Sequence, residues 1–244
     1  MAYLSGDKAA AAKAFELALA DEPKAVSAHL FAALSLEDDA DLPRAIRHLE
    51  AIVTTVYTFP DKFMNKYLPP GRSELGIGVK ITELISARVP VNLTGASMVL
   101  AEAYQLAGRL DEAIGLVHQL HDANPSDLAI QLSLADLLLA DSDFEGVVET
   151  TTGARNDDDL GVALLHMRAA SFIALGHHTA AFDAFRDALA KTARRDAELL
   201  NTVRYDRALS FASVGQKAKA RADFERLYAA DPSYRDVRER LATS

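Results

Sequence analysis

The spacing that organises this chain is plainest in residues 108–120, GRLDEAIGLVHQL. A glycine stands first, an alanine follows at Ala113, a large apolar residue follows at Val117, and Pro125 closes the stretch. Glycine accepts the positive φ at a helix C-terminus, and proline stops one helix and opens the next segment. The alanine lets two helices approach closely, and the larger residue fills the groove between neighbouring pairs. The stretch therefore predicts a helix–turn–helix unit whose second helix runs over 110–123.

The same spacing recurs along the chain. Residues 215–224, GQKAKARADF, repeat it and are followed by Pro232, and residues 6–11, GDKAAA, begin it a third time. Gly176 begins a copy that lacks the proline, and Ala40 begins one with substitutions. Further marks of these copies are Phe15, Ala18, Pro23, Ala45, Leu49, Ile52, Ala181, Phe185 and Ala188. Recurrence of one unit is typical of a solenoid, and the 45 alanines favour helix.

These residues resemble the tetratricopeptide (TPR) repeat, a 34-residue helix–turn–helix family. The resemblance implies an all-α fold: a right-handed superhelical solenoid of antiparallel helix pairs. First helices are expected at 26–38, 94–107, 128–141, 160–175 and 197–214. Second helices are expected at 7–20, 42–56, 110–123, 143–154, 178–191 and 217–229. A polar helix over 233–242 is expected to cap the C-terminal end, because solenoid ends need a polar outer face.

Two units depart from the repeat. The first has only residues 2–5 where a whole first helix should stand, so the chain is either a fragment of a longer protein or begins with a degenerate cap. The apolar side of helix 7–20 must then be covered by another chain, by further N-terminal sequence, or by helix 26–38. The fourth unit is weak at Thr150, Thr151 and Gly153, and the acidic run after it predicts a loop and a helix N-cap.

Residues 59–93 do not fit the repeat. Apolar residues alternate with polar residues or glycine from Leu75 to Ile81 and again from Ile85 to Val91, which is a strand signal. We expect a small β-hairpin near 74–92, with strands 74–82 and 85–92 and a turn at Glu83-Leu84. Its apolar face should lie on neighbouring helices, because two strands alone are marginal in water. The alternatives are an irregular linker, or a free edge that pairs with a partner strand.

The sequence thus divides into four expected segments. Residues 1–58 hold incomplete N-terminal TPR units, 59–93 the insertion with its hairpin, 94–232 further TPR units, and 233–244 the capping helix.

Composition excludes several classes of protein. The net charge is −9, which disfavours a nucleic-acid partner, although residues 185–244 carry 13 basic and 9 acidic residues. There is no cysteine for disulfides or thiol chemistry. No signal peptide and no apolar run long enough to span a membrane is present, so we expect a cytoplasmic protein.

Catalytic and cofactor motifs are missing from the sequence. We find no nucleophile elbow, His-Glu-x-x-His motif or phosphate loop. His118, His121 and Asp122 share a helix face, but the expected position is solvent-exposed and further ligands are not evident. We therefore expect neither an enzyme nor a bound metal or cofactor.

The resemblance implies binding instead. In TPR proteins the first helices line a concave groove that holds an extended peptide. The groove positions expected here are Leu30, Leu34, Glu37, Met98, Glu102, Gln105, Leu132, Asp136, Leu139, His166, Arg204 and Tyr205. The partner would be an unidentified protein or an extended peptide, and the incomplete first repeat makes a homo-oligomer possible.

Arg168 and Arg207 stand inside apolar stripes of two first helices, where the family usually has leucine. A buried charge must be paired, so each is either an internal anchor or, with Arg204 and Tyr205, part of a basic end of the groove. Nearby acids that could serve as anchors are Asp159, Asp187, Asp196 and Glu198.

These observations favour a non-catalytic interaction scaffold that binds its partner through the concave face of the first helices. The alternative is a regulatory or substrate-presenting TPR region of a larger multidomain enzyme or regulator.

Overall fold

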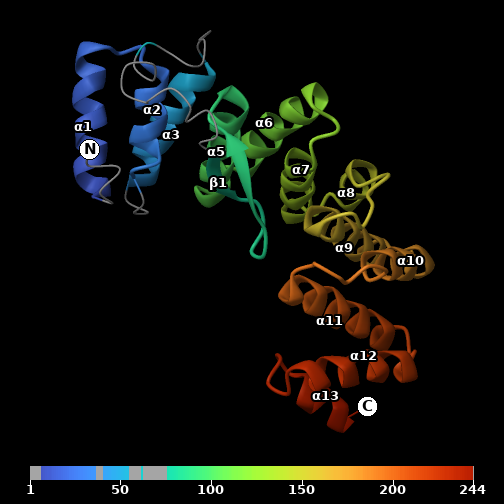
Figure 1. Ribbon diagram of the computed structural model, residues 1–244. Helices are drawn as coiled ribbons and strands as arrows, with labels where there is room; N and C mark the ends of the chain where they lie inside the picture. The colour runs from blue at the N-terminus through green and yellow to red at the C-terminus, as the bar shows by residue number, and fades with distance from the viewer. Residues whose placement is uncertain (1–6, 37–40, 55–61, 63–75, 244) are drawn as a thin grey trace. The chain divides into compact units, whose positions relative to one another are not determined.

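The computed structural model describes residues 7–36, 41–54, 62 and 76–243. Within them the chain forms twelve helices and one two-stranded antiparallel sheet (Figure 1). The fold is all-α with a small β-hairpin, as predicted. The expected groove residue Glu37 and the start of the expected hairpin at 74–75 lie outside the described residues.

The chain divides into two compact units: Met1–Ile81 with Ser86–Pro125, called unit 1 below, and Thr82–Ile85 with Ser126–Ser244, called unit 2. The helices of unit 1 are α1 (Lys8–Asp21), α2 (Val26–Ala33), α3 (Leu42–Val53), α5 (Leu93–Leu106) and α6 (Leu110–Ala123). Those of unit 2 are α7 (Leu128–Ala140), α8 (Phe144–Thr150), α9 (Asp159–Ala174), α10 (His178–Ala188), α11 (Ala197–Ser213), α12 (Lys217–Ala230) and α13 (Val237–Thr243).

Helix ends follow the chemistry of the repeat. Gly108, Gly176 and Gly215 have φ of 72°, 77° and 78°, in the left-handed region that glycine adopts without a steric penalty. Aspartate side chains cap several N-termini by accepting backbone N–H bonds; for example, Asp158 accepts from the N–H of Gly161 at 2.8 Å. The predicted loop and N-cap after the fourth unit are confirmed.

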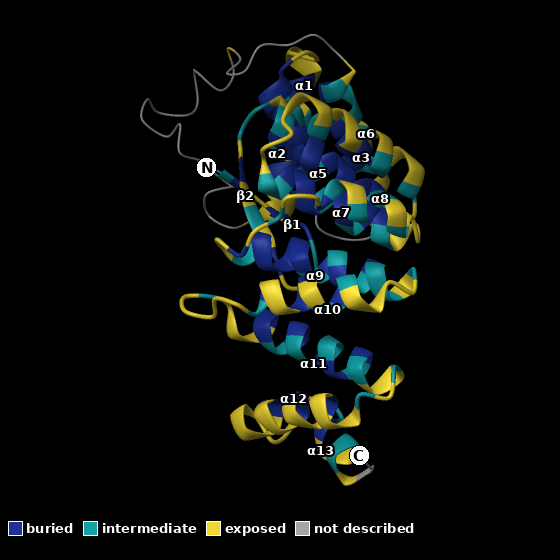
Figure 2. Cartoon of the chain, turned by 90° about the vertical axis from the view of Figure 1, so that its right-hand side faces the viewer, coloured by how far each residue is buried: buried dark blue, intermediate teal, exposed yellow. Residues whose placement is uncertain are grey.

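Packing explains why the repeat alternates small and large apolar residues. Consecutive helices pair, α2 with α3, α5 with α6, α7 with α8, α9 with α10 and α11 with α12. The repeat alanines Ala113, Ala181 and Ala220 are buried at the helix contacts. The larger repeat residues Val117, Phe185 and Phe224 are also buried, whereas the outward face of α12 is exposed (Figure 2).

α1 packs its apolar side on α2. Ala11 is buried, and Phe15 stacks on Phe31 of α2 with ring centroids 5.7 Å apart. Leu19 joins Ala25 and Ala28 in one cluster. Of the three covers that the sequence left open for this helix, contact with the next helix is the one that the described residues show.

The hairpin consists of β1 (Gly76–Lys80) and β2 (Ser86–Pro90), with Val79 opposite Ala87. Its turn is longer than the predicted Glu83-Leu84 pair, because Thr82 organises residues 82–85. The Thr82 hydroxyl accepts the N–H of Ile85 at 3.1 Å, and the Thr82 N–H donates to the Ile85 carbonyl at 3.1 Å. The apolar face of the hairpin is buried, and both strands contact α5.

Several elements are shorter than predicted; for example, α2 ends at Ala33 and not at 38, and α10 ends at Ala188 and not at 191. α8 ends at Thr150, and the buried Thr151 hydroxyl donates to the Val147 carbonyl at 2.7 Å. α13 begins at Val237 and not at 233, because residues before it form a turn that buries Tyr234. Tyr234 and Val237 pack on Tyr205, Phe224 and Leu227. None of the described helices has the length and apolar character that crossing a bilayer requires.

Candidate partner-binding surface

A row of polar side chains links two first helices of unit 2, α9 and α11. His166 on α9 donates from Nε2 to Asp206 on α11 at 2.8 Å, and Arg235 lies 3.9 Å from the other oxygen of Asp206. The side chains of His166, Asp206 and Arg235 are 18%, 35% and 42% exposed, so the row is fixed by its contacts and still reaches the surface. We call these three residues the unit 2 row.

Tyr205, an expected groove residue, is covered by the C-terminal cap. Its hydroxyl donates to Asp236, and the guanidinium of Arg235 lies over its ring at 4.7 Å. Burial and the Asp236 carboxylate raise the pKa of Tyr205. Arg235 lies also 5.3 Å from the Tyr234 ring and has a φ of 45°. Tyr205 therefore holds Arg235 at one end of the unit 2 row.

The three expected arginines do not gather at Tyr205. Arg207 donates from Nε and Nη2 to both oxygens of Asp223 on α12, at 2.8 and 2.7 Å. Arg168 donates to the Val148 carbonyl at 2.5 Å. Both arrangements are those of internal anchors, but the partners are Asp223 and α8 groups and not the four acids we named. Arg207 on α11 reaches α12, the second helix of its own pair, whereas Arg168 on α9 reaches back to α8.

Arg204 on α11 is within electrostatic reach of Arg207 on the same helix and of Asp223 and Arg226 on α12. Burial lowers its pKa, its Nη1 lies 3.4 Å from the Asn201 side chain, and its Nε has no hydrogen-bond partner among the described residues.

The expected groove residues of unit 1 are mostly covered. Leu30 and Met98 are buried, and Leu34 and Gln105 are half-buried. Glu102 on α5 accepts a hydrogen bond from the backbone N–H of Lys80 in β1. Burial raises the pKa of Glu102, and the Lys80 contact opposes that rise. The hairpin thus lies on the side of α5 that the repeat pattern assigned to a partner.

The remaining expected residues lie on α7. Leu132 is buried, whereas Asp136 and Leu139 are half-buried.

Sequence reasoning missed two hydrogen-bonding hubs, the buried Asn156 and the half-buried Glu50. The amide of Asn156 donates to three carbonyls at the end of α10, of which Ala188 is nearest at 2.7 Å, and its oxygen accepts from Arg195 at 3.0 Å. Glu50 on α3 accepts from Tyr104 at 2.9 Å and from Arg109 at 3.1 Å. No repeat position marks either residue, because their partners lie 31 to 59 residues away.

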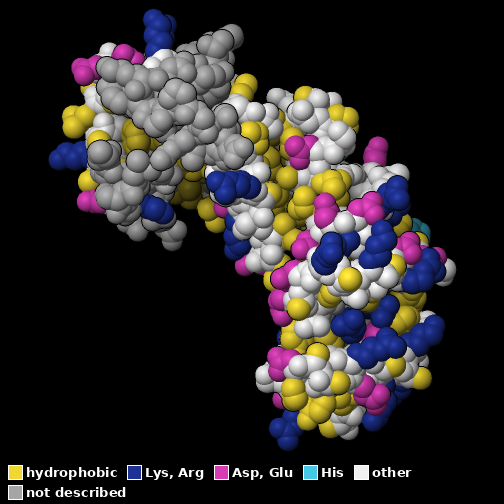
Figure 3. Space-filling view, viewed as in Figure 1, with side chains coloured by type: hydrophobic (Ala, Val, Ile, Leu, Met, Phe, Trp, Pro, Cys, Tyr) yellow, Lys and Arg dark blue, Asp and Glu magenta, His cyan; other side chains and the backbone are white. Residues whose placement is uncertain are grey.

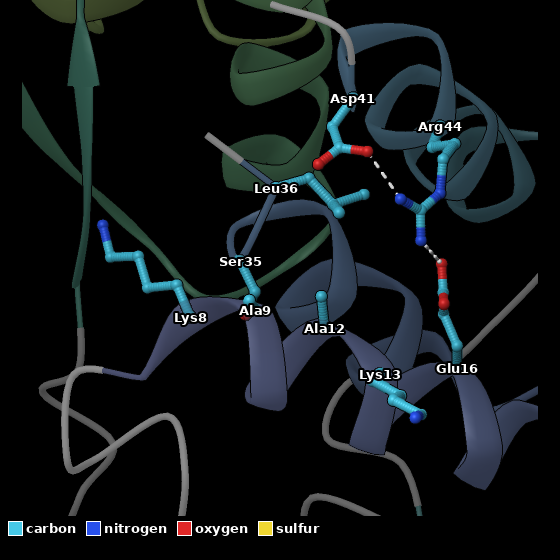
Figure 4. A pocket seen from close by; sticks show the side chains of 9 residues that line it. All are labelled: Lys8, Ala9, Ala12, Lys13, Glu16, Ser35, Leu36, Asp41 and Arg44. Carbon is cyan, nitrogen blue, oxygen red and sulfur yellow. Dashed lines mark hydrogen bonds and ion pairs between the residues drawn. The ribbon is translucent and has the colours of Figure 1, made fainter. Parts of the chain in front are cut away.

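A cavity of about 540 Å³ opens in unit 1 between α1, the end of α2 and the start of α3. Figure 4 shows Arg44 at its wall, bonded to Asp41 at 2.5 Å and to Glu16 at 2.6 Å. Its lining is Lys8, Ala9, Ala12, Lys13, Glu16, Ser35, Leu36, Asp41 and Arg44. Arg44 is neutralised by its two carboxylates, so this cavity presents no free cation from α3.

The exposed side chains of unit 2 mix both charges, with acidic and basic groups interspersed in Figure 3. His118 and Asp122 form an exposed pair at 3.2 Å on α6 of unit 1. Across the described residues, no group of three or more His, Cys, Asp or Glu side chains is placed to hold a metal ion.

Solved structures that resemble this chain include TPR and TPR-like repeat proteins. The N-terminal domain of the EccA1 ATPase from the ESX-1 secretion system of Mycobacterium tuberculosis has a TM-score of 0.65 at 17% identity, over 98% of this chain and 84% of that chain. Kinesin light chain TPR-like repeats from Podosopora anserina have a TM-score of 0.57 at 19% identity, over 91% and 98%. This chain has the TPR fold.

A TPR protein from Thermus thermophilus has a TM-score of 0.51 at 16% identity, covering 90% of this chain and 98% of that one. No protein-family model matches the sequence, and no curated protein matches it. At these identities the likeness of the TPR structures concerns the fold.

Proposed function

We propose that this TPR chain is a non-catalytic scaffold that binds a protein or an extended peptide on the surface formed by its first helices. The observation that carries the proposal is the unit 2 row. His166, Asp206 and Arg235 come from two first helices and the cap turn, and their mutual contacts hold them in place at the surface. A preorganised polar row loses little side-chain entropy when a partner binds.

The same two first helices, α9 and α11, also carry partly exposed apolar side chains, which suits a peptide with mixed character. Ile173 on α9 and Leu209 on α11 are half-buried, and Ala212 is exposed. A partner can therefore bury apolar surface beside charged groups, the usual composition of a protein interface.

The test is affinity capture with the purified chain as bait, followed by mass spectrometry. Asp206→Lys reverses one charge of the unit 2 row. Asp183→Lys makes the same change on the second helix α10, where Asp183 is exposed and pairs with Arg186. We expect a set of proteins that the wild type and Asp183→Lys retain and Asp206→Lys loses. The same captured set for all three baits would reject the first-helix surface.

A second candidate function is supported by the similarity to EccA1. That structure is the N-terminal domain of an ATPase, and the match extends over 98% of this chain. By analogy, this chain would be the regulatory or substrate-presenting TPR region of a larger enzyme. Sequencing the open reading frame on both sides tests this: an adjoining enzyme domain supports it, and stop codons at both ends reject it.

Cytoplasmic localisation, self-association through the first repeat and the four segment boundaries stay predictions from the sequence. Size-exclusion chromatography with light scattering over a range of concentrations tests the self-association.

A further inference from the structure

The side of α5 that carries expected groove residues is occupied by the chain's own hairpin. β1 and β2 both contact α5, Met98 is buried, and Glu102 is half-buried. The hairpin therefore stands on a first helix where the proposed function would otherwise place a partner.

The polar contact between α5 and the hairpin is made to a backbone group of β1 and not to a side chain. The Glu102 carboxylate accepts the N–H of Lys80, the last residue of β1. Every residue except proline has such an N–H, so the contact selects an extended chain without selecting a side chain.

The buried face of β1 is formed by aliphatic residues at alternate positions. Ile77, Val79 and Ile81 are all buried, while Gly78 and Lys80 between them are exposed. Alternate side chains of a strand point to the same face, so three aliphatic residues with a spacing of two are buried together.

Gly95 on α5 lets the second strand pass closely. A Cβ at Gly95 would lie 1.9 Å from the Pro90 carbonyl oxygen and 3.3 Å from a methyl of Val89. The absence of a side chain there is what makes room for the backbone at the end of β2.

We propose that this side of α5, formed by Gly95, Met98 and Glu102, is a binding site for an extended segment with aliphatic residues at alternate positions. The hairpin is its resident occupant, and an extended segment of a partner protein competes with it. Two strands alone are marginally stable in water, so the hairpin depends on α5 as a partner strand would. This step rests on the proposed function.

The test uses a fluorescein-labelled peptide of residues 76–90 and the full chain, with binding measured by fluorescence anisotropy. Val79→Asn puts a polar group into the buried face of the hairpin and leaves α5 unchanged. Ser86→Asn is the matched control, because Ser86 is exposed on β2. We expect the peptide to bind Val79→Asn at least about tenfold more tightly than wild type or Ser86→Asn, since a vacated site is available for a larger fraction of the time.

Adding Glu102→Met to Val79→Asn removes the carboxylate acceptor and should weaken peptide binding by about tenfold. Circular dichroism checks that the variants fold, and Val79→Ala replaces Val79→Asn should the latter unfold. Equal peptide binding by all variants, or none by a folded Val79 variant, overturns the proposal. Should that occur while Asp206→Lys still loses captured proteins, the resident-hairpin proposal fails and the scaffold function stands.

Discussion

Arg207 and Asp223 show how one charged pair replaces a leucine contact inside unit 2. Their side chains are 15% and 3% exposed, and two hydrogen bonds join them. Removing one member of a buried pair leaves an uncompensated charge, which costs far more than removing both. Arg226 lies 3.5 Å from Asp223, but its side chain is largely exposed to solvent. It can therefore offset only part of the free-energy cost of leaving Asp223 without Arg207.

We predict that Arg207→Leu lowers the free energy of unfolding by about 3 kcal/mol, because Asp223 stays buried without its main partner. The double variant Arg207→Leu/Asp223→Leu should return to within about 1 kcal/mol of wild type. Urea denaturation followed by circular dichroism measures both. The control Arg186→Leu breaks an exposed pair on α10 and should cost less than about 1 kcal/mol. Equal losses for Arg207→Leu and Arg186→Leu would contradict the anchor.

Ser142 has a strained backbone conformation, whereas the glycines at the equivalent repeat positions, Gly108 and Gly176, do not. It lies 34 residues from both Gly108 and Gly176 and has the same kind of left-handed backbone, with a φ of 64°. A residue with a Cβ pays a steric cost there that glycine avoids.

We predict that Ser142→Gly raises the free energy of unfolding by about 0.5–1 kcal/mol, since relief of strain outweighs the added freedom of the unfolded chain. Gly176→Ala should do the reverse at the equivalent position. Thermal denaturation of both variants checks this, and a lower midpoint for Ser142→Gly would show that the serine is not strained.

At the scale of elements, the junction of the hairpin with α5 depends on Gly95, and a second helix glycine offers a comparison. Gly115 lies within α6, and a Cβ there would meet nothing within 4 Å. The two glycines share a helical backbone and differ in what passes over them.

We predict that Gly95→Ala destabilises the protein by about 1–3 kcal/mol, because the Pro90 backbone must move. Gly115→Ala should stabilise it by up to about 1 kcal/mol through helix propensity. Hydrogen exchange of the hairpin amides should increase in Gly95→Ala only. Unchanged hairpin exchange in that variant would contradict the close approach.

Three helices of unit 1 meet at a histidine pair. His29 Nδ1 and His48 Nδ1 lie 3.0 Å apart, and His48 Nε2 lies 3.5 Å from Glu16. His29 Nε2 donates to the Pro23 carbonyl at 3.1 Å, so in a neutral pair His29 Nδ1 accepts and His48 donates. The groups that surround His48 are Glu16 from α1, His29 from α2 and Arg44 from α3. Tyr104 and Arg109 donate instead to Glu50, farther along α3.

Burial lowers the pKa of His48, with the Glu16 hydrogen bond opposing it and the neighbouring His29 adding to it. The unfolded chain therefore binds a proton more readily than the folded chain. Stability is complete above the ordinary histidine pKa of 6.5 and is lost as the pH falls toward the folded value. We predict that His48→Gln loses less stability than wild type between about pH 7.5 and pH 5, measured by urea denaturation. An unchanged pH dependence of stability in His48→Gln would contradict the role of the pair.

At the scale of the whole molecule, helix dominates both units, and the described strand residues are the ten of β1 and β2. We predict a far-UV circular dichroism spectrum of a mostly helical protein, with strand in less than about a tenth of the residues. A spectrum dominated by strand would contradict the fold.

The repeat itself could be predicted from the sequence, because its causes are local. Gly108 marks a helix end through its own φ, and Ala113 is small enough for a helix contact whatever its neighbours are. The alternation in 76–90 likewise predicts strands, since a side-chain period of two needs no knowledge of the rest of the chain. Helix pairs, the hairpin and the acidic N-cap before α9 follow from such signals.

The site depends on long-range contacts that no local pattern contains. The repeat position of Glu102 predicts a groove residue, but the hairpin that precedes α5 contacts Glu102 through the backbone of Lys80. Arg207 is hydrogen-bonded to Asp223 on the next helix, and His166 is hydrogen-bonded to Asp206, forty positions later in the chain. The sequence by itself determined the repeats, because propensity and period act over a few residues. Only the tertiary structure decided which first-helix positions reach the surface and which are covered, because that depends on what folds back onto them.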